Sequence, residues 1–177
     1  MGRRRFFEGK SIVLFIIIGM AFYLLWQGRF NDALPEGNKI TTLEFRTLDN
    51  QSFTTDDIGM PFMLIFFNTK TFFTSNIYPN LLIKSMPELR QIEDAGYMKL
   101  IVVIDKKQNS EAVYKVLGQK KYKILENNIY LGNIDELATY FGVRSWPHTF
   151  LIGRDKTIIY QDKIPSVEKV IRILKGA

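Results

Sequence analysis

A long uncharged apolar run near the N-terminus divides this chain into segments suited to different environments. From Ser11 to Trp26 the sequence reads Ser-Ile-Val-Leu-Phe-Ile-Ile-Ile-Gly-Met-Ala-Phe-Tyr-Leu-Leu-Trp, and no charge occurs between Lys10 and Arg29. Residues 11–28 comprise roughly 18 positions, which is near the lower limit for crossing a hydrocarbon layer of about 30 Å. We therefore predict one transmembrane helix at residues 11–28.

The residues around this segment indicate its orientation. Arg3, Arg4 and Arg5 precede it, and an excess of basic residues holds that end of a span in the cytoplasm. Residues 1–10 are thus expected to be cytoplasmic, and the chain beyond the span extracytoplasmic. A cleaved signal peptide is the alternative. It requires a small-x-small cleavage site, and no Ala-x-Ala pattern follows Trp26, so we expect an uncleaved, single-pass signal anchor in the cell membrane.

The remaining chain divides into a tether and a domain. Residues 29–39 are polar and rich in turn formers, which indicates a short tether, and residues 40–177 have the length of one domain. The chain is 46% hydrophobic and 14% aromatic, which provides a packed core and excludes intrinsic disorder. The net charge of +6 includes the N-terminal arginines. We attribute it to membrane orientation and expect no nucleic-acid partner.

Strand and helix patterns alternate along residues 40–177. Alternating or continuous apolar runs predict strands, and amphipathic stretches with caps predict helices. The first two strands are expected to pair as a hairpin, and the complete order predicts an α/β domain. Strands are expected at 42–48, 51–54, 62–67, 100–104, 150–152 and 157–160, and helices at 75–96 (kinked at Pro79, broken at Pro87), 110–120, 135–141 (closed by Gly142) and 166–175.

The first diagnostic segment lies where a buried strand leads into a helix. It reads Phe66-Phe67-Asn68-Thr69-Lys70-Thr71-Phe72-Phe73-Thr74, and Pro79 follows five residues after Thr74. The second segment runs from Tyr140 to Ile152 and contains Trp146-Pro147-His148-Thr149.

Together these segments resemble the membrane-anchored, extracytoplasmic thioredoxin-like family, the redoxin branch of thiol-disulfide oxidoreductases that assist cytochrome c maturation and related assembly. The resemblance covers roughly residues 43–174. It implies a thioredoxin-like sandwich, with a central mixed sheet flanked by helices and an N-terminal β-hairpin. It places Thr71 and Thr74 on the two cysteines of the CxxC motif, and Pro147 on the family's cis-proline. The position of Pro79 supports this placement, because the family's first helix carries a proline at the same spacing.

The chain contains no cysteine. Disulfide exchange requires a thiolate nucleophile, and a threonine hydroxyl forms no redox couple and stays protonated at physiological pH. We therefore expect this domain not to catalyse thiol-disulfide exchange. No cofactor or metal is predicted either, because the sequence has no glycine-rich phosphate loop and no Gly-x-Ser-x-Gly elbow, and no ligand cluster accompanies His148.

The candidate interaction surface consists of Phe72, Phe73, Trp146 and His148. In the resembling family the residues between the cysteines face solvent, so the two phenylalanines would form an aromatic patch near Trp146, as binding surfaces often do. Burial of one or both phenylalanines in the core is the alternative. His148 is the only histidine. It is either a ligand or base at this surface, or a structural polar residue.

The two threonines at the degenerate CxxC positions also have two interpretations. Thr71 and Thr74 either bind an anion or carbonyl at the start of the helix, where free N–H groups and the helix dipole favour one, or they cap the helix while the site is vestigial.

These observations lead to one favoured function and two alternatives. The favoured hypothesis is a redox-inactive, membrane-tethered thioredoxin-like domain that binds a protein partner in the cell envelope and acts as a binding or assembly module. The first alternative is an accessory factor in maturation of an envelope redox enzyme or cytochrome, working with a thiol-bearing partner. The second is a structural subunit of a membrane complex that packs through the small-residue patch Gly19-Met20-Ala21.

Overall fold

The computed structural model describes residues 16–21, 23, 33–67, 77–105, 107, 110–119 and 122–176. The chain separates into two units, Met1–Ala33 and Leu34–Ala177. In the first unit, residues 16–21 and 23 are helical. Within the described parts of the chain, no helix is both long and apolar enough to cross a membrane. Most of the predicted span at residues 11–28 lies outside them.

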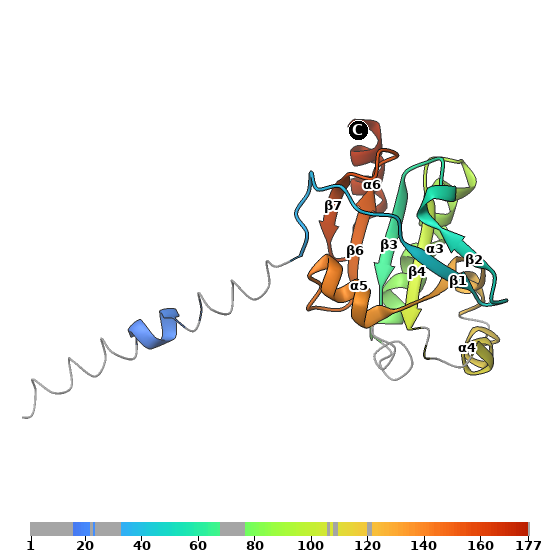
Figure 1. Ribbon diagram of the computed structural model, residues 1–177, viewed down its shortest axis with the longest axis horizontal. Helices are drawn as coiled ribbons and strands as arrows, with labels where there is room; N and C mark the ends of the chain where they lie inside the picture. The colour runs from blue at the N-terminus through green and yellow to red at the C-terminus, as the bar shows by residue number, and fades with distance from the viewer. Residues whose placement is uncertain are drawn as a thin grey trace, which may run out of the picture. The chain divides into compact units, whose positions relative to one another are not determined.

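The second unit alternates strands and helices (Figure 1). In chain order its elements are β1 (Glu44–Thr47), β2 (Ser52–Thr54), a 3-10 turn (Thr55–Asp57), β3 (Phe62–Phe66), α3 (Ile77–Asp94), β4 (Lys99–Asp105), α4 (Ser110–Leu117), a second 3-10 helix (Lys123–Asn128), β5 (Ile129–Gly132), α5 (Ile134–Phe141), β6 (His148–Ile152), β7 (Ile158–Asp162) and α6 (Val167–Gly176).

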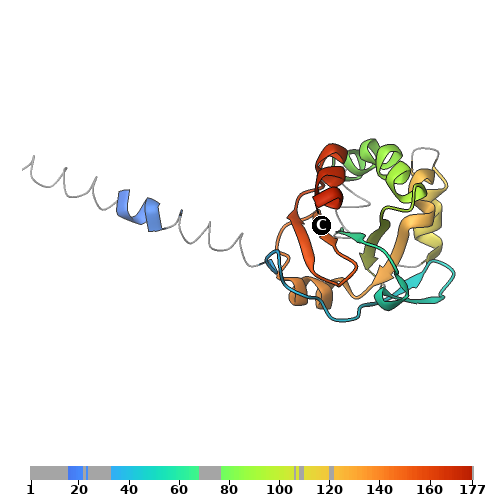
Figure 2. The ribbon, with the colours of Figure 1, turned by 90° about the horizontal axis from the view of Figure 1, so that it is seen from above.

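The strands form one seven-stranded sheet in the order β2-β1-β5-β4-β3-β6-β7. Strands β3, β4 and β5 are parallel, and the pairs β1–β2, β1–β5, β3–β6 and β6–β7 are antiparallel. Helices α3 and α6 lie on one side of the sheet and α5 lies on the other (Figure 2). The predicted α/β domain with a mixed sheet flanked by helices is therefore confirmed, and so is its N-terminal hairpin.

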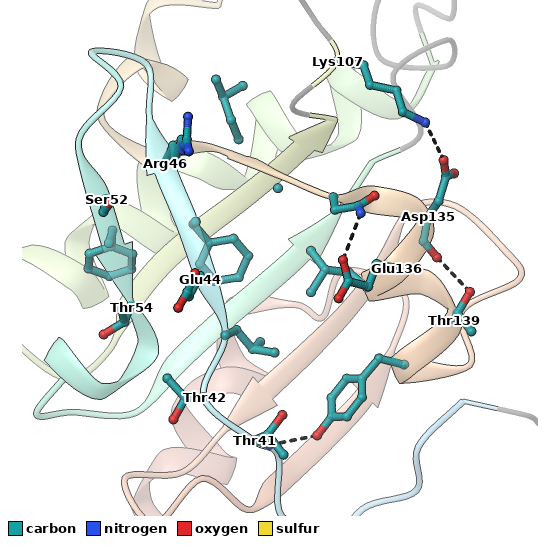
Figure 3. A pocket seen from close by; sticks show the side chains of 18 of the residues that line it. Thr41, Thr42, Glu44, Arg46, Ser52, Thr54, Lys107, Asp135, Glu136 and Thr139 are labelled. Carbon is teal, nitrogen blue, oxygen red and sulfur yellow. Dashed lines mark hydrogen bonds and ion pairs between the residues drawn. The ribbon is translucent and has the colours of Figure 1, made fainter.

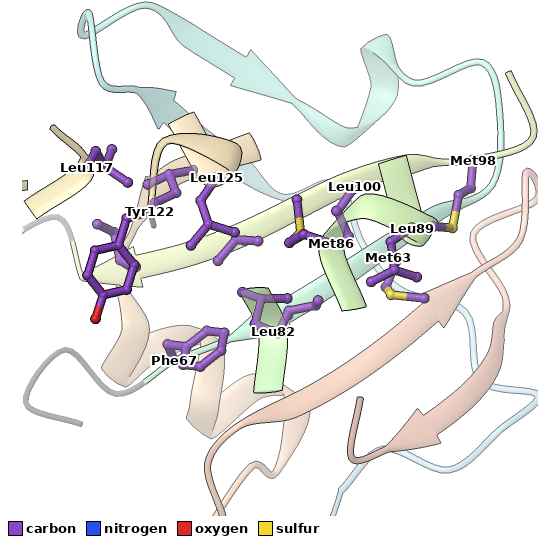
Figure 4. Close-up of a cluster of buried hydrophobic side chains, with 14 of the residues drawn as sticks. Met63, Phe67, Leu82, Met86, Leu89, Met98, Leu100, Leu117, Tyr122 and Leu125 are labelled. Atoms are coloured by element: carbon purple, nitrogen blue, oxygen red, sulfur yellow. The ribbon is translucent and has the colours of Figure 1, made fainter. Parts of the chain in front are cut away.

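Strand β3 is at the centre of the core, and all five of its residues are buried. Met63 and Ile65 pack in a cluster with Leu82, Met86 and Leu89 of α3 (Figure 4). Successive side chains of a strand point to opposite faces, so the remaining β3 residues face the α5 side. A central strand covered by helices on both faces requires a continuous apolar sequence.

The predicted element order lacks β5. This strand is only four residues long, yet it pairs with β4 on one side and with β1 on the other. It therefore joins the N-terminal hairpin to the parallel core. Its strand conformation depends on these two neighbours, which lie far away in the sequence.

The predicted helix break at Pro87 is wrong. Helix α3 runs from Ile77 to Asp94 without interruption. Pro79 is in the first turn, where backbone N–H groups have no intrahelical acceptor. Pro87 removes one helical hydrogen bond, but its neighbours Met86 and Leu89 are fully buried against the sheet. That packing holds the helix together across the missing bond.

Part of the predicted tether, residues 29–39, is bound to the domain. The Leu34 N–H donates to the Phe141 carbonyl at 2.9 Å, and the Gly37 N–H donates to the Ile158 carbonyl at 2.8 Å. The Ile158 N–H in turn donates to the Asn38 carbonyl at 2.8 Å. From Leu34 onward the chain is thus fixed along α5 and β7.

Candidate functional site at the carboxyl end of β3

The carboxyl end of β3 and the start of β6 lie side by side, because Phe66 pairs with His148 across the two antiparallel strands. The bond between Trp146 and Pro147, directly before β6, is cis. The predicted cis-proline position is thus at the strand end from which the chain leaves toward α3. Four predicted site residues on that connection, Thr71, Phe72, Phe73 and Thr74, lie outside the described residues.

The end of α5 positions the loop that carries Pro147. Gly142 has a φ of 65°, a left-handed conformation that glycine adopts without steric cost. The Val143 N–H donates to the Ala138 carbonyl at 2.8 Å, and the Val143 side chain is buried. The predicted closure of this helix by Gly142 is confirmed.

A cluster of buried aromatic rings supports this end of the sheet. The ring of Phe66 lies 5.2 Å from that of Phe141 and 5.9 Å from that of Phe150, and the latter two are 4.6 Å apart. All three side chains are fully buried. Strands β3 and β6 and helix α5 are therefore held in a fixed arrangement next to the loop.

His148 is part of this support and not of the surface to which sequence analysis assigned it. Its exposed fraction is 8%, and its ring lies 4.9 Å from that of Phe150. Its Nε2 atom is 3.0 Å from Oε1 of Gln161, a hydrogen-bonding distance. Burial lowers the pKa of His148, against the opposing effects of the Gln161 hydrogen bond and the Asp162 carboxylate. The geometry thus favours the structural role over the ligand or base role.

Trp146 and Pro147 are half-buried. Among the predicted site residues that the structure describes, these two are therefore accessible to a partner. Thr149 is fully buried, and its hydroxyl has no hydrogen-bond partner among the residues that the structure describes.

A second candidate site, which sequence analysis missed, is a groove between the N-terminal hairpin and α5 (Figure 3). We call it the hairpin–α5 groove. Its volume is about 1410 Å³. It is lined by Thr41, Thr42, Leu43, Glu44, Phe45, Arg46, Asn50, Ser52, Phe53, Thr54, Lys107, Leu131, Gly132, Asn133, Asp135, Glu136, Leu137, Thr139 and Tyr140.

Most charged groups on the α5 side of this groove have partners. Lys107 Nζ lies 2.9 Å from Asp135 Oδ2, and this carboxylate raises the pKa of Lys107. Asn133 Nδ2 donates to Glu136 Oε2 at 2.9 Å. The groove draws on several separate segments of the chain, so no local sequence pattern marks it.

Among the residues that the structure describes, no group of three or more histidine, aspartate or glutamate side chains is arranged to hold a metal ion.

The sequence matches no family model and no curated protein sequence. Solved structures, however, share the arrangement of its second unit. The pneumococcal exposed lipoprotein thioredoxin Etrx1 of Streptococcus pneumoniae superimposes with a TM-score of 0.56 at 20% identity, covering 77% of this chain and 100% of that protein. The domain has a thioredoxin-like fold.

Two further structures agree with this assignment. StoA from Bacillus subtilis gives a TM-score of 0.53 at 19% identity, over 75% of this chain and 96% of its own. A thiol:disulfide interchange protein from Bacteroides sp. gives 0.61 at 16% identity, over 81% and 93%. Sequence identities this low show the fold alone. The fold is thus that of thiol-disulfide oxidoreductases, in a chain without cysteine.

Proposed function

We propose that this protein is a redox-inactive, membrane-tethered thioredoxin-like module that binds a protein partner at the outer face of the membrane. The partner surface is the carboxyl end of β3 with Trp146 and Pro147, together with Phe72 and Phe73, which the sequence assigns to the same surface. The observation that carries the proposal is the absence of cysteine from the entire chain, combined with a thioredoxin-like fold.

The chemistry supports binding over catalysis. Thiol-disulfide exchange proceeds by attack of a thiolate on a sulfur atom, and no residue of this chain supplies either. The described parts of the chain also hold no metal-binding cluster that would support another reaction. This end of the sheet instead has two half-buried residues, Trp146 and Pro147, in a region where the rings of Phe66, Phe141 and Phe150 are fully buried.

The residue types also suit a binding surface. Tryptophan is enriched among the side chains that dominate protein interfaces, and truncating such a residue commonly costs about 2 kcal/mol or more, which is about a thirtyfold loss of affinity.

Photocrosslinking in intact membranes tests the proposal. A photoreactive phenylalanine analogue replaces Phe73 or Trp146 in separate variants, and crosslinked proteins are identified by mass spectrometry. The matched control is the same analogue at Tyr97, an aromatic residue that is 66% exposed and precedes the opposite end of the sheet, where β4 begins. We expect one dominant envelope protein from the first two positions and not from Tyr97.

Truncation variants complete the test. Trp146→Ser should reduce recovery of that partner about tenfold or more, whereas Tyr97→Ser should leave it unchanged. Equal recovery with both variants contradicts the proposal. If the partner is recovered but neither Phe73 nor Trp146 crosslinks to it, the interaction would be assigned to the membrane segment. The structural-subunit alternative predicts that result.

The similarity to thiol-disulfide oxidoreductases favours one second candidate, an accessory factor in maturation of an envelope redox enzyme or cytochrome that works with a thiol-bearing partner. The two candidates differ in the partner's chemistry. Insulin reduction by the purified protein should be absent under both. Addition of the crosslinked partner should produce reduction only if this partner carries a redox-active dithiol.

A further inference from the structure

The hairpin–α5 groove has an unpaired strand edge along one wall. Strand β1 pairs with β5 through Arg46–Leu131 and Thr47–Tyr130. Strand β5 ends at Gly132, and the chain turns into α5 at Ile134. The ladder between β1 and β5 therefore stops after two residue pairs, although β1 continues back to Glu44.

The direction of the backbone groups follows from the pairing of β1 with β2. The Thr47 N–H donates to the Gln51 carbonyl, and the Thr55 N–H donates to the Leu43 carbonyl. Since alternate residues of an antiparallel strand bond to opposite sides, the backbone groups of Glu44 point away from β2. They face the place where β5 would lie if it continued.

The groove lining has three carboxylates, Glu44, Asp135 and Glu136, against two basic side chains. Lys107 pairs with Asp135, and Arg46 donates to Asn50 Oδ1. The Glu44 side chain is exposed and has no hydrogen-bond or ion-pair partner among the described residues. Glu136 of α5 lines the opposite wall, and Figure 3 shows the two carboxylates on either side of the groove. Between them the lining includes the apolar residues Phe45, Leu131 and Leu137.

We propose that the hairpin–α5 groove binds an extended peptide segment that carries a basic side chain. The backbone of this segment pairs with the N–H and C=O of Glu44, as a strand added to an open sheet edge does. Its basic side chain pairs with Glu44 or Glu136, and an adjacent apolar side chain contacts the groove floor. This surface is separate from the surface at Trp146, so it does not depend on the function proposed above.

A titration of the full chain with two matched peptides tests this inference. The isotope-labelled protein in detergent micelles is titrated with acetyl-Thr-Val-Lys-Val-Thr-amide, and separately with acetyl-Thr-Val-Glu-Val-Thr-amide, while backbone amide resonances are followed. We expect the lysine peptide to shift the amides of Glu44, Gly132 and Glu136 and to slow hydrogen exchange of the Glu44 amide. The glutamate peptide should produce much smaller shifts.

Variants identify the charge that is recognised. Glu44→Gln should weaken binding of the lysine peptide about fivefold, in line with an exposed ion pair, and added salt should reduce that difference. Glu126→Gln, a change of an exposed carboxylate on the second 3-10 helix, is the control and should leave binding unchanged.

Three results would overturn the inference. The first is the absence of any shift up to about 5 mM peptide. Even a weak complex, with a Kd of about 1 mM, would be mostly formed at that peptide concentration. The second is equal binding of the two peptides, which removes the basic side chain from the recognition. The third is a set of shifts confined to residues 143–147, which assigns the peptide to the other surface.

Discussion

The structure leaves little room for a side chain at Gly132. A Cβ atom built on it would lie 2.8 Å from Val103 Cγ1, 3.0 Å from Leu137 Cδ1 and 3.3 Å from Phe45 Cδ1. These three neighbours come from β4, α5 and β1, and all are buried. Gly132→Ala therefore forces several packed elements apart at once.

The cost follows from the packing. Ordinary Cβ contacts lie at 3.4 Å or beyond, so a Cβ 2.8 Å from the buried Val103 forces this side chain or the backbone to shift. Inserting a methyl group into a packed core typically costs about 1–3 kcal/mol, so we expect a loss of about 2 kcal/mol in the free energy of unfolding. With a urea m-value of about 2 kcal/mol per molar, the unfolding midpoint should fall by roughly 1 M.

Urea unfolding of the purified full chain in mild detergent, followed by circular dichroism, measures this loss. Gly59→Ala is the matched control, because no atom lies within 4 Å of the position that its new Cβ would occupy and its backbone is not left-handed. It should shift the midpoint little. Val103→Ala in the Gly132→Ala background removes the closest contact. The double variant should be more stable than the sum of the two single losses predicts, with a coupling of about 1 kcal/mol.

The reasoning is refuted if Gly132→Ala unfolds at the wild-type midpoint. It is also refuted if Gly59→Ala loses as much stability, since the effect would then come from glycine's backbone freedom and not from the contacts around β5. Strict additivity in the double variant would show that Val103 is not the residue that resists the new methyl group.

Three further predictions concern His148, Asp56 and the pair Thr71 and Thr74. Burial lowers the pKa of His148, so near pH 6.5 the unfolded chain binds more protons than the folded chain. The wild type should therefore lose stability relative to His148→Gln as the pH falls from about 7.5 to about 5. An equal difference in stability at both pH values would contradict this. Hydrogen bonds from Lys156 and Thr42 lower the pKa of the Asp56 carboxyl from its ordinary value, and Lys156→Met should raise it in carboxyl NMR titrations; an unchanged pKa would assign the shift to another cause. Thr71→Cys with Thr74→Cys should form a reversible intramolecular disulfide, seen as a loss of two hydrogens by mass spectrometry, and failure to close would contradict the placement of these positions on CxxC.

The sequence predicts those elements whose conformation depends on local residues. Gly142 ends α5 because glycine suits the left-handed residue after a helix. The apolar run at β3 predicts a strand buried on both faces, because few other conformations bury so many consecutive apolar residues.

The sequence fails where distant neighbours decide the conformation. Strand β5 exists because β1 and β4 lie on either side of it. Helix α3 continues through Pro87 because Met86 and Leu89 are packed on the sheet. The burial of His148 also depends on tertiary packing, namely its hydrogen bond with Gln161 of β7 and its contact with the ring of Phe150. The hairpin–α5 groove could not be predicted from the sequence either, because its lining residues come from separate segments of the chain.

The end of the sheet at Pro147 shows why a thioredoxin-like fold remains in a chain without cysteine. Its described supports are the pairing of Phe66 with His148, the rings of Phe141 and Phe150, and the capped end of α5. Each is a backbone hydrogen bond or an apolar contact, and none requires sulfur. Since disulfide exchange requires thiolates and the scaffold does not, the fold is compatible with a sequence that has no cysteine.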